Sequence, residues 1–564
     1  MAAIVAAMPA RHLVVGLDGA DLDLVRALGP GVLPNLFRQM ERGAFAHQRS
    51  VLPPATLPNW ATFLTGTEPG AHGVFDFTTR RGYQVRFTAG TVREVPTVFA
   101  RLDRLGRRCA VVGFPATWPP EPLEHGVFLS GWDSPVAFEA DRSFVWPPSL
   151  YDAIRARFGA PRFDDVDEFD ADAPGWLEGL PAALAARVER KTALARWLLD
   201  REDWDAFAFY FGESDTASHY LYSLHDPRSP RTPPHVADPG GLARVYAALD
   251  RALGELLEAA GDGVELTVVS DHGFGGSSDK VLYLNRALAE AGLLAFRKGS
   301  VGRGLVARAK ELALTTLPPR LRERIFRAGG AILPSLLESR ARFGAIDMER
   351  TVAFSDELNY FPAVHLNVRG REPRGVVDPR AIAATVREVE AALLALRDPW
   401  TGAPVVARVH RREELFDGPF ADRAPDLVLE LHLDGGYSYN LMPSASAPPG
   451  AGVFRRLEPS EHLGRKGRSL PGSHRDRGLF VASGPRVAPV GEVDSTIADA
   501  TATILARMDV AVPPGFAGRV LFELLKDTSG GAVASLPEAP ALATPASGDP
   551  ARVEARLRAL GYID

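Results

Sequence analysis

Two short apolar runs, each stopping at an acidic residue, constrain the fold of this chain more than any other feature. The run at residues 13–17 ends at Asp18, and the run at residues 266–270 ends at Asp271 and His272, with a glycine directly after each stop. Short β-branched runs of this kind are typical of buried parallel strands. Ligands of open α/β sheets bind at the carboxyl ends of such strands. The pattern therefore predicts that these three polar side chains meet at one edge of a parallel sheet.

The first half of the chain supports this fold class throughout its length. Residues 11 to about 290 alternate strand-like runs with helical stretches, which predicts an α/β fold with a doubly wound, mostly parallel sheet and helices on both faces. Later stretches of the same character indicate that the sheet resumes near the C-terminal end. The candidate strands are residues 12–17, 109–114, 205–211, 265–270, 365–369 and 478–482, and the candidate helices are residues 182–199, 245–260, 378–396 and 496–508.

One break in this alternation divides the chain. Between residues 297 and 327, a helical stretch holds nine lysines and arginines and two acidic residues. It is either a solvated insertion or a cap with a patch for an anionic substrate or membrane surface. The expected parts are an N-terminal extension at 1–10, an α/β core at 11–290 and 351–527, a basic helical cap at 291–350, an Ala/Pro/Gly-rich linker at 528–549, and an amphipathic helix at 550–564.

Composition excludes several classes of protein. The net charge of −6 argues against a general nucleic-acid binder. The single cysteine, Cys109, excludes intramolecular disulfides and cysteine-rich zinc sites, and its strand-like surroundings predict a buried thiol. No stretch approaches the roughly 20 apolar residues of a membrane span. The first eleven residues make a poor signal peptide, so we expect a cytoplasmic protein.

Further potential metal ligands lie elsewhere in the chain. Asp215 and His219 are four residues apart, so a helix would place both on one face. His474 lies in a Gly-Ser-His loop. Carboxylates with imidazoles suit Zn²⁺, and Mn²⁺ less strongly, whereas Ca²⁺ would need more oxygens. The six side chains divide into two sets of three, Asp215, His219 and His474 for one divalent ion and Asp18, Asp271 and His272 for the other.

Thr56 is the candidate nucleophile. It lies in a proline-rich loop that runs into an apolar helical stretch. Two ions about 4 Å apart can clamp the attacking and leaving oxygens of a phosphoryl displacement. Thr56 would complete the second set of ligands, and a lowered hydroxyl pKa would let it attack phosphorus. Asn59 could donate its amide to a phosphoryl oxygen.

Four further residues have weaker claims to the site. Trp60 is expected in packing, or as the wall of a substrate pocket. Arg369 and Arg371 could meet an anionic group of the substrate, or could lie on the surface. His72 is expected to brace the loop that holds Thr56.

The order and setting of these residues resemble the alkaline phosphatase superfamily, and most closely its type I phosphodiesterase/nucleotide pyrophosphatase branch. Residues 56–77 resemble the T-x-P-N…TG…P…HG signature of that branch. Residues 212–219, 270–273 and 472–474 resemble its metal-binding segments. Three more segments, at 113–120, 130–135 and 365–375, resemble the bacterial subgroup of alkaline-phosphatase-superfamily phosphohydrolases/phosphomutases.

This resemblance implies a two-metal phosphohydrolase that acts on a small phosphate ester. We favour a phosphodiesterase working through Thr56 and a covalent phosphoenzyme. Sulfatases carry a Cys or Ser and an Arg where this chain has Thr56 and Trp60, so a sulfatase is disfavoured. The alternatives are a phosphomonoesterase, a phosphomutase or phosphotransferase of the same superfamily, and, in another class, a metal-stabilised binding protein without catalysis.

Overall fold

The structure is a computed structural model of the 564-residue chain. It describes residues 11–87, 92–131, 142–159, 174–232, 238–297, 342–357, 361–448, 450–464, 469–526 and 534–537. The expected N-terminal extension, most of the basic cap, most of the linker and the C-terminal helix lie outside the described residues.

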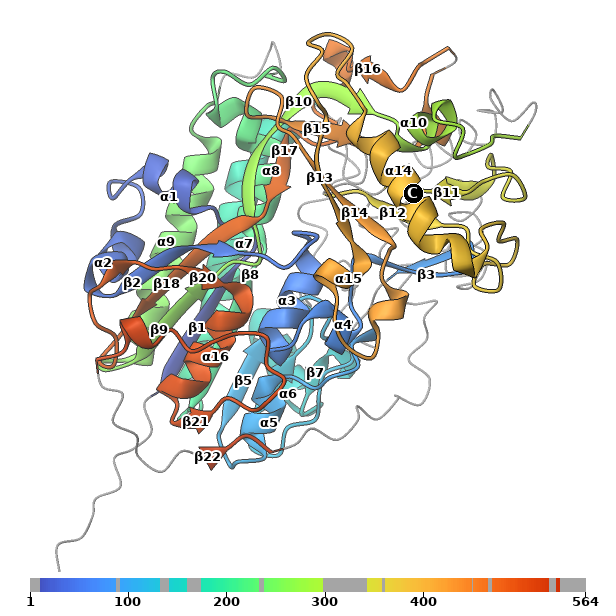
Figure 1. Ribbon diagram of the computed structural model, residues 1–564. Helices are drawn as coiled ribbons and strands as arrows, with labels where there is room; N and C mark the ends of the chain where they lie inside the picture. Colours follow the sequence, from blue (N-terminus) through green and yellow to red (C-terminus); the bar gives the residue numbers. More distant parts are fainter. Residues whose placement is uncertain are drawn as a thin grey trace, which may run out of the picture.

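A large sheet forms the centre of the fold, with the strand order β19-β2-β18-β9-β1-β8-β5-β6-β7 (Figure 1). Its five middle strands pair in parallel, which confirms the predicted fold class. They are β9 (Glu265–Val269), β1 (His12–Leu17), β8 (Ala206–Phe211), β5 (Cys109–Val112) and β6 (Val127–Leu129).

One strand from the C-terminal part of the chain interrupts the order of the N-terminal ones. β18 (Arg477–Ser483) lies antiparallel to β9 on one side and to β2 (Ala44–Arg49) on the other. The periphery consists of two-residue strands, β7 (Val145–Trp146), β19 (Gly491–Glu492) and β20 (Ser495–Thr496). The sheet is therefore completed by residues far apart in the sequence.

Helices cover both faces of this sheet, and the alternation within β1 shows why. Leu13 and Val15 pack into one apolar core, beneath α7 (Trp176–Leu199) and α9 (Gly241–Ala260). Val14 points to the opposite core. That second core is covered by α3 (Thr56–Thr65), α5 (Val98–Asp103) and α16 (Ile497–Arg507). The predicted helices at 182–199 and 245–260 fall within α7 and α9.

A smaller region lies beside the large sheet. It holds the strands between residues 353 and 475, which we expected to continue the core, whereas β18 and α16 from the same expected range do join the core. Its strands pair with one another and not with the large sheet. The sequence could not show this, because a period-two pattern predicts a strand but not the sheet that the strand joins. One sheet has the order β11 (Ala353–Phe354), β12 (Ala363–Leu366), β14 (Leu427–Leu431) and β13 (Val406–Arg411), next to α14 (Ile382–Leu394). Another is built on β10 (Gly273–Leu282), with β15 (Ser438–Leu441), β16 (Phe454–Arg456) and β17 (Gly472–Arg475).

The remaining elements connect these two regions. A hairpin of β3 (Thr78–Arg81) and β4 (Gln84–Phe87) extends from the core toward β12, and α8 (Glu213–His225) contacts both β17 and β10. The other α-helices described are α1 (Leu22–Leu28), α2 (Pro34–Arg42), α4 (Pro69–His72), α6 (Leu150–Phe158), α10 (Leu284–Glu290) and α15 (Arg412–Leu415).

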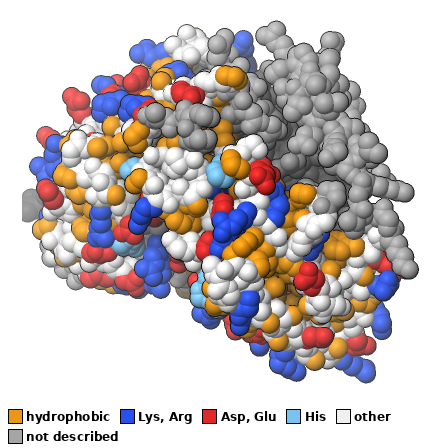
Figure 2. All heavy atoms as spheres, turned by 90° about the horizontal axis from the view of Figure 1, so that it is seen from above, with side chains coloured by type: hydrophobic (Ala, Val, Ile, Leu, Met, Phe, Trp, Pro, Cys, Tyr) orange, Lys and Arg blue, Asp and Glu red, His pale blue; other side chains and the backbone are white. Residues whose placement is uncertain are grey.

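Charged side chains of both signs lie on the surface of the molecule (Figure 2). On the face drawn in Figure 2, basic and acidic side chains are interspersed. Among the described helices, none combines the length and the apolar character that crossing a membrane requires.

Candidate metal centre

Three of the predicted metal ligands follow the ends of two central strands. Asp18 comes directly after β1, and Asp271 and His272 come shortly after β9. The Nε2 atom of His272 lies 3.5 Å from Oδ1 of Asp18 and 3.3 Å from Oδ2 of Asp271. All three side chains are buried. The parallel pairing of β1 and β9 thus brings together polar groups about 250 residues apart.

Neutral donors orient the two carboxylates. The indole N–H of Trp60 donates to Oδ2 of Asp18 over 3.1 Å, and the hydroxyl of Tyr210 donates to the same oxygen. The backbone N–H of Gly19 donates to Oδ1 of Asp271 over 3.1 Å. These bonds turn the remaining oxygen of each carboxylate toward His272.

The other three predicted ligands come from α8 and β17. Asp215 and His219 lie one turn apart on α8, and Oδ1 of Asp215 is 3.3 Å from Nε2 of His219. His474 on β17 places its Nε2 atom 3.4 Å from Oδ1 of Asp215 and 3.1 Å from Nε2 of His219. The helix and the strand therefore complete one compact group of donors.

Each imidazole of the centre is oriented by a backbone carbonyl. A ring that carries its proton on Nδ1 donates to the carbonyl and leaves Nε2 as a metal donor. The Nδ1-to-oxygen pairs are His219 with Gly472 at 3.0 Å, His272 with Gly273 at 3.1 Å, and His474 with Pro54 at 2.9 Å.

The two sets of ligands touch through their rings. The rings of His272 and His474 stack with their centroids 3.6 Å apart. Phe274 packs against His219, His272 and His474, with ring centroids 4.7, 5.8 and 5.3 Å away. A Cβ at Gly19 would lie only 2.7 Å from the Phe274 ring, so a glycine after Asp18 leaves room for this ring. No local sequence pattern indicates the role of Phe274.

Ligand atoms converge at two points. Those of Asp215, His272 and His474 lie within 4.8 Å of one another, and so do those of Asp18, Asp271 and His272. His272 belongs to both groups, whereas the predicted division assigned it to the second set alone. His219 adjoins the first group through its contacts to Asp215 and His474.

The electrostatics of the centre suit a cation. Burial, and then the charge of Asp18, raises the pKa of Asp271 well above its usual value. Burial lowers the pKa of His474 to about 4 and that of His272 well below its ordinary value, so both rings are neutral at pH 7. The buried Oδ2 of Asp271 accepts no hydrogen bond from the described residues. Carboxylates and neutral imidazoles around such an oxygen fit divalent metal ions.

Thr56 lies at the edge of this centre. It is the first residue of α3, and its Oγ1 atom is 3.4 Å from Nε2 of His272. Unlike the buried ligands, Thr56 is partly exposed. The N-terminus of a helix favours negative charge, so an anionic phosphate ester would be stabilised beside this hydroxyl.

A known protein family matches most of the chain. The family described as type I phosphodiesterase / nucleotide pyrophosphatase matches residues 12–445. This chain belongs to that family. The match confirms the predicted resemblance and includes every predicted ligand of the centre except His474. Membership indicates a phosphohydrolase of the alkaline phosphatase superfamily.

Solved structures that are similar to the chain share little sequence with it. Human ectonucleotide pyrophosphatase / phosphodiesterase 5 is 13% identical, with a TM-score of 0.46 over 92% of this chain and 100% of that one. Phosphonoacetate hydrolase from Sinorhizobium meliloti 1021, in complex with phosphonoformate, is 18% identical, with a TM-score of 0.49 over 87% of this chain and 94% of that one. No curated protein matches the chain. The family assignment therefore rests on the family match.

Two residues that we considered for substrate contact are buried in this member of the type I phosphodiesterase family. The amide of Asn59 donates to the carbonyls of Val51, Pro53 and Ala55 at 3.3, 3.2 and 2.9 Å, and its oxygen accepts from the N–H of Val51 at 2.8 Å. Asn59 thus fixes the loop that leads into Thr56.

Trp60 has 0% of its surface exposed, and its ring packs edge-on against Phe63, Phe114 and Tyr210. It lies behind Asp18, which differs from the pocket wall that we considered. The bracing of Asp18 by Trp60 and Tyr210 depends on how neighbouring elements meet, and no local sequence signal reveals it.

The two predicted substrate arginines are placed differently from the ligands. Arg371 donates to Asp426 at 2.8 and 2.6 Å and to Glu372 at 3.2 Å. The side chain of Arg369 is 66% exposed, and it lies 3.9 Å from Asp378. Within the described part of the chain, neither arginine bonds to Thr56 or to a predicted metal ligand. His72 is buried, and its Nε2 atom lies 3.0 Å from Oγ1 of Thr62, which is on the helix α3 that Thr56 begins.

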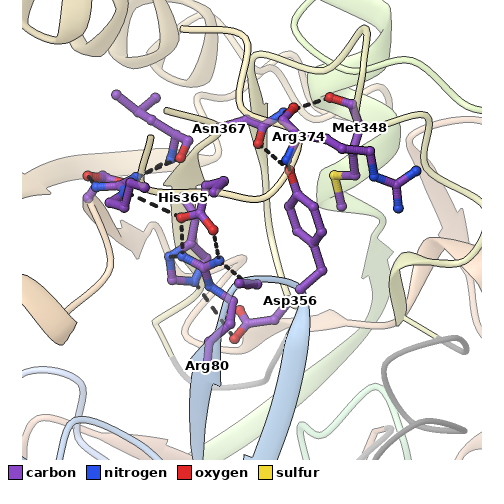
Figure 3. A network of polar contacts seen from close by, with 12 residues as sticks. Arg80, Met348, Asp356, His365, Asn367 and Arg374 are labelled. Atoms are coloured by element: carbon purple, nitrogen blue, oxygen red, sulfur yellow. Dashed lines mark hydrogen bonds and ion pairs between the residues drawn. The ribbon is translucent and has the colours of Figure 1, made fainter. Parts of the chain in front are cut away.

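A second cluster of charged groups joins the β3–β4 hairpin to the smaller region (Figure 3). Arg80 on β3 donates to both carboxylate oxygens of Glu372, at 2.9 and 3.0 Å, and lies 3.4 Å from Nδ1 of His365. Asp356 lies 3.9 Å from the other ring nitrogen of His365. The hairpin that follows the Thr56 segment is thereby tied to β12.

The cluster continues through a carboxylate shared by two arginines. Arg371 and Arg412 both donate to Asp426. Each acid of the cluster thus has a basic neighbour. We call these residues the cap network, although none of them lies in the expected basic cap at 291–350: Arg80, Asp356, His365, Arg371, Glu372, Arg412 and Asp426.

Proposed function

We propose that this protein is a two-metal phosphodiesterase in which Thr56 is the nucleophile. The observation that carries the proposal is the position of the Thr56 hydroxyl, 3.4 Å from Nε2 of His272 and at the head of α3. His272 belongs to both groups of converging ligands. A hydroxyl in this position can meet a phosphorus atom whose oxygens face the ions that these ligands would hold.

The donor set supports zinc, with manganese as the alternative, because it combines three carboxylates with three imidazoles. Bound ions would supply Lewis acidity, which stabilises charge on the phosphoryl oxygens and lowers the pKa of a nearby hydroxyl. The chain itself holds the donors in place. Asn59 fixes the loop before Thr56, and Trp60 and Tyr210 orient Asp18, so we assign these three residues to positioning.

The reaction would proceed in two displacements. Thr56 releases its hydroxyl proton to solvent, and its oxygen forms a bond to phosphorus while the bond from phosphorus to the ester oxygen breaks. The leaving alcohol takes a proton from water. Water then attacks phosphorus, the bond to Thr56 breaks, and the threonine regains its proton. The sum is hydrolysis of one phosphate ester bond.

A diester is the substrate that we favour. Monoesterases hold the extra charge of their substrate with added cationic groups, and the two arginines considered for that purpose are paired with acids or exposed. We expect a higher kcat/KM for diesters than for the matching monoesters, and hardly any cleavage of aryl sulfates. A strong preference for monoesters would move the assignment to a phosphatase or mutase.

Substitution of Thr56 tests the nucleophile. Thr56→Ala should keep the fold and most of the metal but lose roughly 10³-fold or more in turnover, because a nucleophile and its positioning each supply several powers of ten. Thr56→Ser should keep part of the activity, since the hydroxyl survives. Thr65→Ala, at the far end of the same helix, is the matched control and should remain active.

Stereochemistry separates this mechanism from direct attack by water. Cleavage of a chiral phosphorothioate diester should proceed with net retention, because two inversions occur at phosphorus. Net inversion, together with near-normal turnover of Thr56→Ala, would end the nucleophile assignment.

A further inference from the structure

Arg231 is a completely buried arginine outside the metal centre, and it binds only neutral groups. Its exposed fraction is 0%. Its Nη2 atom donates to the carbonyls of His462 at 2.5 Å, Ser469 at 3.2 Å and Glu461 at 3.4 Å. Its Nη1 atom donates to the carbonyl of Leu470 at 2.6 Å. Arg231 makes no ion pair with a carboxylate of the described residues, so its hydrogen bonds serve the backbone.

These acceptors lie on two stretches of chain that meet at the guanidinium. Glu461 and His462 belong to one stretch, and Ser469 and Leu470 to the other. The two stretches approach closely, because a Cβ at Gly464 would lie 1.3 Å from the carbonyl oxygen of Ser469. A planar group with five N–H donors can bind several carbonyls at once, which a lysine ammonium on its flexible stem cannot reproduce. Arg231 therefore fixes this crossing of the backbone.

The stretch held by Arg231 leads directly to a metal ligand. The carbonyl of Leu470 accepts from Arg231, that of Pro471 accepts from the N–H of Ser277 at 2.8 Å, and that of Gly472 lies 3.0 Å from Nδ1 of His219. His474 follows two residues later. The approach of β17 to α8 is close, since a Cβ at Gly472 would fall 2.1 Å from the carbonyl oxygen of Ser218. A small shift at Leu470 would consequently move both Gly472 and His474.

The neighbouring strands are fixed to the same guanidinium through Asn440. Its Oδ1 atom accepts from Arg231 at 3.2 Å and from the hydroxyl of Ser469 at 3.0 Å. Its amide donates to the carbonyls of Ser278 at 2.7 Å and Lys280 at 2.9 Å on β10. Arg231 thereby sets β17 relative to β10, which begins beside His272.

We propose that Arg231 is a positioning residue for His474 and, through it, for the metal ion of the Asp215 set. This inference rests on the proposed two-metal function. Arg231 acts on the metal through the backbone of residues 469–472 and touches neither substrate nor metal. Asp18 and Asp271 reach the centre from the large sheet, so their ion does not depend on Arg231.

Metal binding by the full-length protein tests the role of Arg231. The wild type and Arg231→Met would be stripped with a chelator and titrated with Zn²⁺ alone, with stoichiometry measured by elemental analysis. Arg231→Met should keep one ion at wild-type affinity and bind the other about 10- to 100-fold more weakly, as for the loss of other partners that orient ligands. His474→Ala is the reference, because it should affect the same ion.

Two companion variants protect the test against loss of folding. Arg231→Lys is milder and should weaken the same ion by a smaller factor. In Arg231→Ala, added guanidinium ion at low concentration should restore part of the lost affinity. Arg507→Met is the control for loss of a buried arginine: Arg507 is also fully buried and donates to the carbonyls of Leu266 and Ser483, but near the opposite end of β9, and unlike Arg231 it also pairs with Glu265. It should lower thermal stability and leave both affinities unchanged.

The outcomes distinguish this inference from the function beneath it. Equal affinities for both ions in Arg231→Met and the wild type would overturn the role of Arg231, whatever the thermal stability. If the wild type binds one ion only, the two-metal function fails. The effect of Arg231→Met on that single affinity then decides whether Arg231 positions His474.

Discussion

The metal centre and the cap network are both buried clusters of acids and histidines, but they differ in what surrounds the acids. In the cap network, guanidinium groups approach the carboxylates, as where Arg371 and Arg412 share Asp426. In the metal centre, the carboxylates lie against imidazoles and neutral N–H and O–H donors. The cap network contains its own positive charge, whereas in the metal centre a bound cation would supply it under the proposed function.

This difference separates two uses of a buried carboxylate. In the cap network, burial opposes ionisation of Asp426, but the hydrogen bond from Arg371 and the charge of Arg412 outweigh it and lower its pKa. In the metal centre, burial and the charge of Asp18 act together and raise the pKa of Asp271. The charge of Asp426 should therefore stabilise the folded chain by itself, whereas that of Asp271 should do so only when an ion is present.

The largest difference is expected between two buried histidines. His272→Ala removes a donor that belongs to both groups of converging ligands, so turnover should fall by more than the about 100-fold typical of losing a partner outside the ligand shell. His365→Ala removes the imidazole of the cap network and should leave both ions bound. Turnover and metal content of the purified variants measure the contrast. Retention of full metal content by His272→Ala would show that the ions bind elsewhere.

Two matched carboxylate substitutions should differ in their effect on stability. Asp426→Asn leaves two guanidinium groups with a weakened partner and should cost about 3 kcal/mol of unfolding free energy, with or without Zn²⁺. Asp271→Asn should cost little in metal-free protein. At a zinc concentration of about 100 times Kd, each filled site should add about 2.7 kcal/mol, and Asp271→Asn should lose the contribution of its own site. Denaturant unfolding measures both, and equal behaviour of the two variants would contradict the comparison.

The smallest effect is expected at Asp76, which lies beside the cap network. Its pKa is raised, whereas that of Asp426 in the network is lowered. Burial, and then the charge of Asp356, raises the pKa of Asp76 to about 7. The folded protein thus holds this proton more tightly than the unfolded chain, and stability falls as pH rises from about 4 to 7. Asp76→Asn should raise the melting temperature more at pH 8 than at pH 5.

Asp356→Asn provides the opposite sign for this test. Burial opposes ionisation of Asp356, but His365 and Arg342 outweigh it and lower its pKa. Its charge therefore stabilises the fold above its unfolded pKa, and the asparagine variant should melt at a lower temperature at pH 8. A pH-independent effect of Asp76→Asn would show that its carboxyl does not titrate in this range.

Much of the metal centre follows from local sequence patterns. An apolar run that stops at an acid predicts both the strand and the end at which Asp18 and Asp271 lie. A four-residue spacing predicts that Asp215 and His219 share a helix face. These patterns suffice because parallel strands and helices have fixed geometry, so residues far apart in sequence are placed by the same rule.

The remaining features depend on which elements become neighbours. The period of β8 predicts the face on which Tyr210 lies, but its bond to Asp18 requires the register that pairs it with Gly16. Room for Trp60 at this place exists because a Cβ at Gly16 would lie 3.0 Å from its ring. Similarly, Arg80 and Glu372 are 292 residues apart, and no local pattern joins them. The separate sheet of the smaller region was missed for the same reason.

The position of β18 has a consequence for the synthesis of the protein. Within the described part of the chain, β18, β19 and β20 are the strands that pair with β2, and all of them follow residue 476. During synthesis, β2, which precedes the Thr56 loop, therefore cannot pair with these strands until more than four-fifths of the 564 residues have been added. His474 emerges just before β18. A chain that ends before residue 474 would lack this proposed ligand as well as β18, and the unpaired edge of β2 would be open to aggregation.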